Sequence, residues 1–183
     1  SGDEEVETSA IGLLSGVPYA KTIVGVTQFA APATRAVDAD TWTHVAGVWN
    51  ATESTISVYV DGLLEFVTLT AENAVALSGP GTLYLNGAPS SPSFAAGHID
   101  DIRVWGYART IGQTNRWMDQ MVDGQSAGLL AYYPFDDAGN DAEDMTVAYP
   151  SLEAADFALK GLGLAIGTAQ AAAVRTEEPR VIP

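Results

Sequence analysis

Four stretches of sequence decide the fold: TWTHVAGVW (residues 41–49), ISVYVDG (56–62), HIDDIRVW (98–105) and GLLAYYPFD (128–136). In the second stretch, apolar residues at alternate positions predict a half-buried antiparallel strand. Asp61 and Gly62 tolerate positive φ, so they predict a tight hairpin turn into a returning strand at 63–69. Short strands separated by Gly, Pro, Asn and Asp turns predict an all-β fold, an antiparallel two-sheet sandwich or jelly roll.

One short helix interrupts the strands after residue 105. Thr110 and Gln113 stand three residues apart, as in a capping box, and Gly124 predicts the end of the helix. The apolar residues of this segment fall roughly on one helical face, which we expect to cover one end of the core. They are Ile111, Trp117, Met118 and Met121.

The remaining segments predict the domain limits. We expect an acidic tail or linker at 1–9, one jelly-roll domain over 10–136, and an acidic, Ala-rich C-terminal extension over 137–183. Before residue 41 we expect two strands, at 11–16 and 21–29, followed by a loop at 30–34. A further strand is predicted at 81–85, and segment 151–174 fits either a strand or a helix.

Composition excludes several classes of function. The chain has 183 residues and a formal net charge of −15, so a nucleic-acid phosphate backbone or an anionic membrane would be repelled. No run of about 20 apolar residues is present, so no membrane insertion is expected. The absence of cysteine excludes disulfides, thiolate nucleophiles and zinc-thiolate sites.

The four stretches, in this order, resemble the laminin-G-like, concanavalin A-like (pentraxin-like) jelly-roll family found in large modular bacterial surface proteins. The match covers roughly residues 10–136 and departs at the start, where the usual opening strands before Trp42 are not found. The sheet is therefore expected to have an open edge. Segment 151–174, a neighbouring subunit or residues outside this sequence would cover it.

The resemblance implies binding and not catalysis. Glycoside hydrolases of this general fold need two carboxylates, which laminarinase-like relatives carry in a Glu-x-Asp-x-x-Glu strand. The corresponding stretch has His98 and Arg103 at the two Glu positions, so we expect no enzyme activity. His44 lies within a strand and is interpreted as structural.

Calcium is the cofactor that the resemblance suggests, bound by carboxylates at the sandwich rim. Alternation places Asp100 on the face of Ile102 and Val104, where a carboxylate needs a cation, an arginine or several N–H donors. A structural, hydrogen-bonded aspartate is the competing interpretation. The candidate metal ligands are Asp100, Asp101, Asp136 and Asp137.

Aromatic residues supply the candidate ligand-binding positions, because sugar rings stack on them, although most aromatics in a sandwich belong to the core. Tyr59 and Trp49 are the candidates, and alternation turns Tyr59 away from the apolar face of its strand. We expect an extracellular or cell-surface, secreted adhesion or recognition module that binds carbohydrate or a surface protein. The alternatives are a structural subunit that self-associates into a filament, sheath or surface layer, and a glycoside hydrolase-like enzyme.

Overall fold

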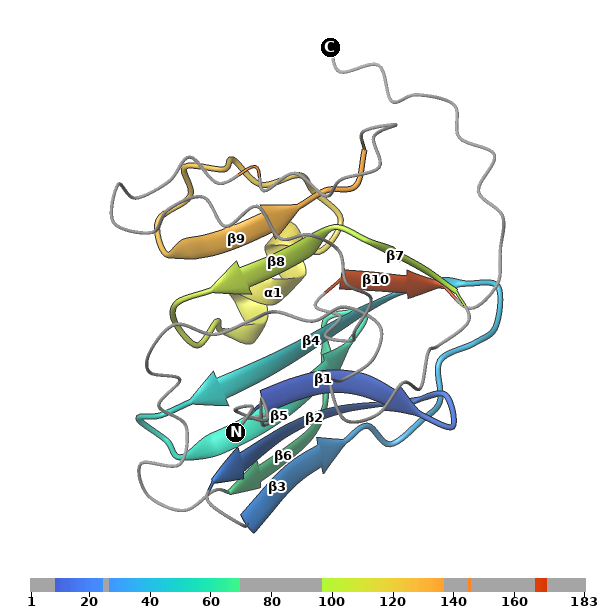
Figure 1. Cartoon of the computed structure of the whole chain (residues 1–183), viewed down its shortest axis with the longest axis vertical. Helices are drawn as coiled ribbons and strands as arrows, with labels where there is room; N and C mark the ends of the chain where they lie inside the picture. The colour runs from blue at the N-terminus through green and yellow to red at the C-terminus, as the bar shows by residue number, and fades with distance from the viewer. Residues whose placement is uncertain (1–8, 25–26, 70–96, 137–144, 146–166, 171–183) are drawn as a thin grey trace, which may run out of the picture.

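The computed structural model describes residues 9–24, 27–69, 97–136, 145 and 167–170. These form antiparallel sheets with one short helix, as in a jelly-roll sandwich (Figure 1). The strand predicted at 81–85 lies outside the described residues.

The first sheet has three strands in the order β1-β2-β3, where the sequence predicted only two strands before Trp42. Ser15 and Gly16 connect the first two, and both have positive φ, 52° and 80°. These are the dihedrals of a tight hairpin turn, so Val17 and Pro18 belong to a strand and not to the predicted turn. The bounds are β1 Ser9–Leu14, β2 Val17–Val24 and β3 Thr27–Pro32.

The second sheet has five strands in the order β6-β5-β4-β10-β7. Asp61 and Gly62 have φ of 49° and 73°, which confirms the predicted hairpin turn between β5 and β6. β10 lies between β4 and β7 and pairs with both, so a strand from segment 151–174 covers the edge of β4. The bounds are β4 Trp42–Asn50, β5 Thr55–Val60, β6 Leu63–Leu69, β7 His98–Asp100 and β10 Gly167–Gln170.

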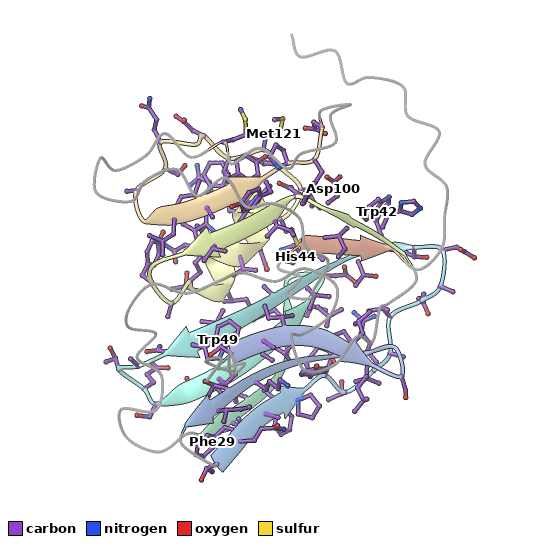
Figure 2. The ribbon with its side chains drawn as sticks, in the orientation of Figure 1. Phe29, Trp42, His44, Trp49, Asp100 and Met121 are labelled. Atoms are coloured by element: carbon purple, nitrogen blue, oxygen red, sulfur yellow. The ribbon has the colours of Figure 1, made fainter. Side chains whose placement is uncertain are left out.

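The two sheets pack face to face around one apolar cluster. Alternate residues of β5 point into it, so Ile56, Val58 and Val60 are fully buried. Ile11 enters from β1, and Trp49 packs at the margin between the sheets (Figure 2). One face of β4 and β5 packs against the first sheet. The alternate side chains of these two strands therefore point to the opposite face of the five-stranded sheet.

The predicted strand at 99–105 is two strands, because Asp101 has a positive φ of 61° and interrupts it. β7 precedes Asp101 and pairs with β10, whereas β8 (Ile102–Trp105) follows it and pairs with β9 (Leu129–Tyr133). The strand therefore leaves the five-stranded sheet at this residue. β8 and β9 form a separate two-stranded sheet beside α1 (Figure 1).

The helix α1 (Ile111–Trp117) begins as predicted and ends early. Thr110 accepts from the Gln113 backbone N–H, and the Gln113 side chain accepts from the Thr110 backbone N–H, which confirms the capping box. The predicted apolar face is confirmed in part, because Trp117 packs against the cluster of Val122, Leu129 and Tyr132, whereas Ile111 and Met121 are about half exposed. Figure 2 labels Met121, which follows the helix. Thr114 is the buried helical residue. No helix in the described ranges is long and apolar enough to cross a membrane.

Candidate functional site

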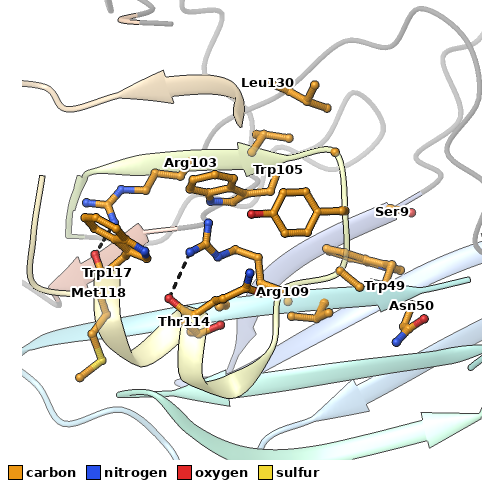
Figure 3. A pocket seen from close by; sticks show the side chains of 18 of the residues that line it. Ser9, Trp49, Asn50, Arg103, Trp105, Arg109, Thr114, Trp117, Met118 and Leu130 are labelled. Carbon is orange, nitrogen blue, oxygen red and sulfur yellow. Dashed lines mark hydrogen bonds between the residues drawn. The ribbon is translucent and has the colours of Figure 1, made fainter. Parts of the chain in front are cut away.

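A pocket of about 610 Å³ opens between the outer face of β4, strand β8 and α1 (Figure 3). Strand β4 supplies the side chains that alternation turns away from the core, His44, Ala46 and Val48. The loop between β8 and α1 supplies the opposite wall. This volume is in the range of small-molecule sites in proteins.

Three side chains at alternate positions, Trp105, Tyr107 and Arg109, form the wall of this pocket that follows β8. The rings of Trp105 and Tyr107 meet edge to face, with centroids 5.9 Å apart. The guanidinium of Arg109 lies 3.8 Å from the Trp105 ring centroid, a close cation–π contact. Gly128 lies against Tyr107 with φ of 79°, and a side chain there would overlap the ring.

Buried Arg103 joins β8 to the end of α1. Its guanidinium pairs with both carboxylate oxygens of Asp101 and donates to the backbone oxygens of Trp117 and Gln120. The carbonyl groups at a helix C-terminus have no partner within the helix, and a cation is favourable there. Arg103 therefore supplies hydrogen-bond donors to the carbonyl groups at the end of α1. The sequence had predicted that the helix would continue past this point, to residue 123.

Tyr132 packs against the same arginine, with the Arg103 guanidinium 5.4 Å from its ring centroid. Burial first, and the nearby Asp101 carboxylate second, raises the pKa of Tyr132 to about 12. The phenol therefore stays protonated at neutral pH. Asp101 and Arg103 both line the pocket. Their interactions with each other, with the end of α1 and with Tyr132 therefore fix the position of this part of the pocket wall.

His44 and Trp49 each bury a ring nitrogen at the pocket margin. His44 Nδ1 and Trp49 Nε1 have no hydrogen-bond partner among the described residues. Burial, followed by the charge of Arg103, lowers the pKa of His44, although Asp61, Asp119 and Asp101 act against it. Burial and the charge of Arg103 therefore favour the neutral form of His44.

Of the two ligand-binding residues predicted from the sequence, one lines the pocket and the other does not. Trp49 lines the pocket, at the end of β4. Tyr59 does not line it, although its register partner Ala46 does. The structure therefore places Tyr59 next to the pocket on the same sheet, with its side chain half-buried.

Three of the four predicted metal ligands lie within the described residues. Both oxygens of Asp101 accept from Arg103, so a cation would compete with that guanidinium. Asp136 is exposed after β9, and Asp137 lies outside the described residues. Within the described ranges, no group of three or more His, Asp or Glu side chains could hold a metal ion.

The face predicted for Asp100 is wrong. Ile99, and not Asp100, packs with Ile102 and Val104 in one apolar cluster. The left-handed backbone at Asp101 shifts the alternation by one residue, so Ile99 takes the place predicted for Asp100. The reason for expecting a cation at Asp100 is therefore removed, and calcium binding stays a prediction.

The pocket wall contains three residues that were not predicted as ligand-binding positions, Trp105, Tyr107 and Arg109. In the sequence they are spaced as Trp105-x-Tyr107-x-Arg109, at the end of a strand and before the helix cap Thr110. Strand alternation ends at Trp105, because the chain bends at Gly106 and Tyr107, so this spacing alone does not group the three side chains. Their common position in the pocket wall depends on this bend, which sequence alone does not show.

Comparison with known proteins agrees with this architecture. A laminin G-type family model, described as the concanavalin A-like lectin/glucanases superfamily, matches residues 14–115. No curated protein sequence matches the chain. The structure is similar to a crystal structure of a proposed carbohydrate-binding protein from Bacteroides ovatus, with 20% sequence identity and a TM-score of 0.55. That alignment covers 76% of this chain and 45% of the Bacteroides protein, so the chain spans less than half of its length. The chain belongs to the concanavalin A-like lectin/glucanases superfamily.

Proposed function

We propose that this chain is a non-catalytic carbohydrate-binding module that serves adhesion or recognition at a cell surface. The pocket beside α1 carries this proposal, because it combines aromatic rings with polar side chains in a concave site of suitable size. Trp105 and Tyr107 offer apolar ring surface, while Asn50 and Arg109 offer N–H donors. A sugar needs both, since its ring has apolar C–H faces and a polar hydroxyl edge.

The carboxylates of the pocket support binding without hydrolysis. Glycoside hydrolysis requires two carboxyl groups across the scissile bond. Among the described residues that line the pocket, Asp101 is the single carboxylate, and Arg103 already occupies both of its oxygens. The described lining therefore does not supply the two carboxyl groups, one as acid and one as nucleophile or base, that hydrolysis needs.

A glycan array followed by calorimetry on the best oligosaccharide tests the proposal. Tyr107→Ala is the informative variant, because Tyr107 is 42% exposed and its removal leaves the core intact. Phe66→Ala is the matched control, since Phe66 is equally exposed on β6 and does not line the pocket. We expect about a tenfold weaker Kd for Tyr107→Ala and an unchanged Kd for Phe66→Ala. An equal loss in both variants, or no glycan binding at all, would contradict the proposal.

A second candidate function is assembly into a larger structure, and one observation favours it. β6 is the terminal strand of the five-stranded sheet as described, and it carries four large apolar side chains that are 42–59% exposed. An apolar edge strand is a place where another chain can pair. These residues are Leu63, Leu64, Phe66 and Val67.

Light scattering on the purified chain, with and without Ca²⁺, separates the two candidates. A monomer under both conditions contradicts assembly by this chain alone and leaves glycan binding as the function. A concentration-dependent oligomer that Val67→Lys dissociates would support assembly through β6. Dependence of that oligomer on Ca²⁺ would also support the calcium prediction.

A further inference from the structure

Few of the N–H groups of the Arg109 guanidinium donate hydrogen bonds to described residues. Its Nη2 donates to the Gln113 backbone oxygen at 3.1 Å, and its guanidinium stacks on Trp105. A guanidinium has five N–H donors. Among the described residues, the other four N–H groups of Arg109 have no hydrogen-bond partner.

Of the four arginines in the described residues, two form ion pairs with described carboxylates, and Arg109 and Arg116 form none. Arg35 pairs with Asp61 and Glu65, and Arg103 pairs with Asp101. The chain has 23 acidic residues and 8 basic residues, so a carboxylate partner is easily available to a basic side chain. Arg109 has no carboxylate partner within the described residues, although it is partly removed from water.

The environment of Arg109 suits an anion. The charged residues that line the pocket are Arg103, Arg109 and Asp101, which makes the described lining positive by one charge in a chain of −15. Burial lowers the pKa of Arg109 from its ordinary value, so a bound anion would offset this cost of desolvation. Stacking on Trp105 already holds the planar guanidinium, which reduces the entropy lost when a ligand binds.

We propose that the pocket binds an acidic sugar, a uronic acid whose carboxylate pairs with Arg109. The inference rests on the proposed carbohydrate binding and adds the class of sugar. A carboxylate and a guanidinium are both planar and form two parallel hydrogen bonds. A uronic acid carries its carboxylate directly on the pyranose ring, so one sugar unit can place its ring in the aromatic pocket and its acid group at Arg109.

Paired probes test this inference. The probes are short oligomers of galacturonic, glucuronic and mannuronic acid, each compared by calorimetry with its own methyl ester. Esterification removes the charge and keeps the sugar. At an ionic strength of 0.15 M the Debye length is about 8 Å, so repulsion from the distant acidic surface is screened while direct contact with Arg109 persists.

We expect at least one acid to bind about tenfold or more tightly than its ester. Arg109→Gln should remove that preference, and Arg109→Lys should retain part of it. Arg116→Gln is the matched control, because it removes the same charge from the protein. Arg116 is exposed on α1 and does not line the pocket. Thermal unfolding of each variant establishes that the fold is kept.

Three results would overturn the inference. Acid and ester could bind equally, a sulfated oligosaccharide could bind better than every uronic acid, or Arg116→Gln could weaken acid binding as much as Arg109→Gln does. In each case glycan binding itself would remain, so the proposed function would stand. Failure of all acidic and neutral glycans to bind would remove both.

Discussion

Replacing Arg103 by methionine should destabilise the fold strongly. Arg103 is 7% exposed and its guanidinium pairs with Asp101 and donates to the carbonyls of Trp117 and Gln120. Methionine fills most of the volume of the side chain stem and removes all of these donors. The change therefore isolates the polar network at the junction of β8 and α1.

The size of the effect follows from the groups left behind. Two backbone carbonyls lose a charged donor, at about 1 kcal/mol each. The Asp101 side chain is 24% exposed, so loss of its ion pair is partly compensated by water and costs about 2 kcal/mol. The free energy of unfolding should fall by about 4 kcal/mol in total.

Urea unfolding measures this loss in the free energy of unfolding. A double-mutant cycle then separates the contribution of the ion pair from that of the carbonyl hydrogen bonds. The second substitution is Asp101→Asn, because asparagine tolerates the left-handed backbone of Asp101 and removes only the charge. Arg103→Met and Asp101→Asn should be coupled by about 1–2 kcal/mol, since the carbonyl bonds lie outside the pair. Arg116→Met, on the exposed side of α1, should change stability by less than about 0.5 kcal/mol.

Two results would refute this reasoning. If the two substitutions were additive within about 0.5 kcal/mol, Asp101 and Arg103 would not form the pair described. If Arg103→Met cost less than about 1 kcal/mol, the arginine would not hold the end of α1. A large loss without coupling would instead assign the stabilisation to the carbonyl bonds.

Four further predictions concern single residues. The pKa of His44 is lowered by burial, so below about pH 6.5 the unfolded chain takes up a proton that the folded chain does not. The free energy of unfolding should then fall by up to about 1.4 kcal/mol per pH unit as the pH drops, and urea titrations of His44→Gln should lack this slope. Gly128→Ala should cost about 1–3 kcal/mol in thermal unfolding, because Gly128 has positive φ and lies against Tyr107. Gly112→Ala, with open space around it in α1, should instead stabilise by about 0.5–1 kcal/mol. Ile56→Ala should cost about 2–5 kcal/mol in the same measurement, since Ile56 is fully buried between the sheets, and an unchanged midpoint would contradict the packing described.

Much of the fold could be predicted from neighbouring residues alone. The β5–β6 turn follows from Asp61 and Gly62, which accept the positive φ of a tight turn. The start of α1 follows from Thr110 and Gln113, three residues apart. Each of these features is decided within a few residues, so the sequence contains the whole interaction.

Errors arose where a distant contact or one backbone angle intervened. The helix was expected to reach residue 123, but it ends at Trp117, where Arg103 from β8 takes the carbonyl oxygens. Asp100 was placed on the wrong face because the positive φ of Asp101 was not foreseen. An aspartate visits this conformation readily, but sequence pattern does not say which aspartate does.

The candidate site required the tertiary structure. Its walls come from β4, β8 and α1, and β8 begins 52 residues after β4 ends. Periodicity could predict which residues leave the core of each strand, and it correctly turned Tyr59 away from Val58. It could not show that Trp49 and Arg109 line one pocket, or that four N–H groups of Arg109 have no hydrogen-bond partner among the described residues. These properties depend on how separate segments pack, and packing is a relation between distant residues that no local pattern encodes.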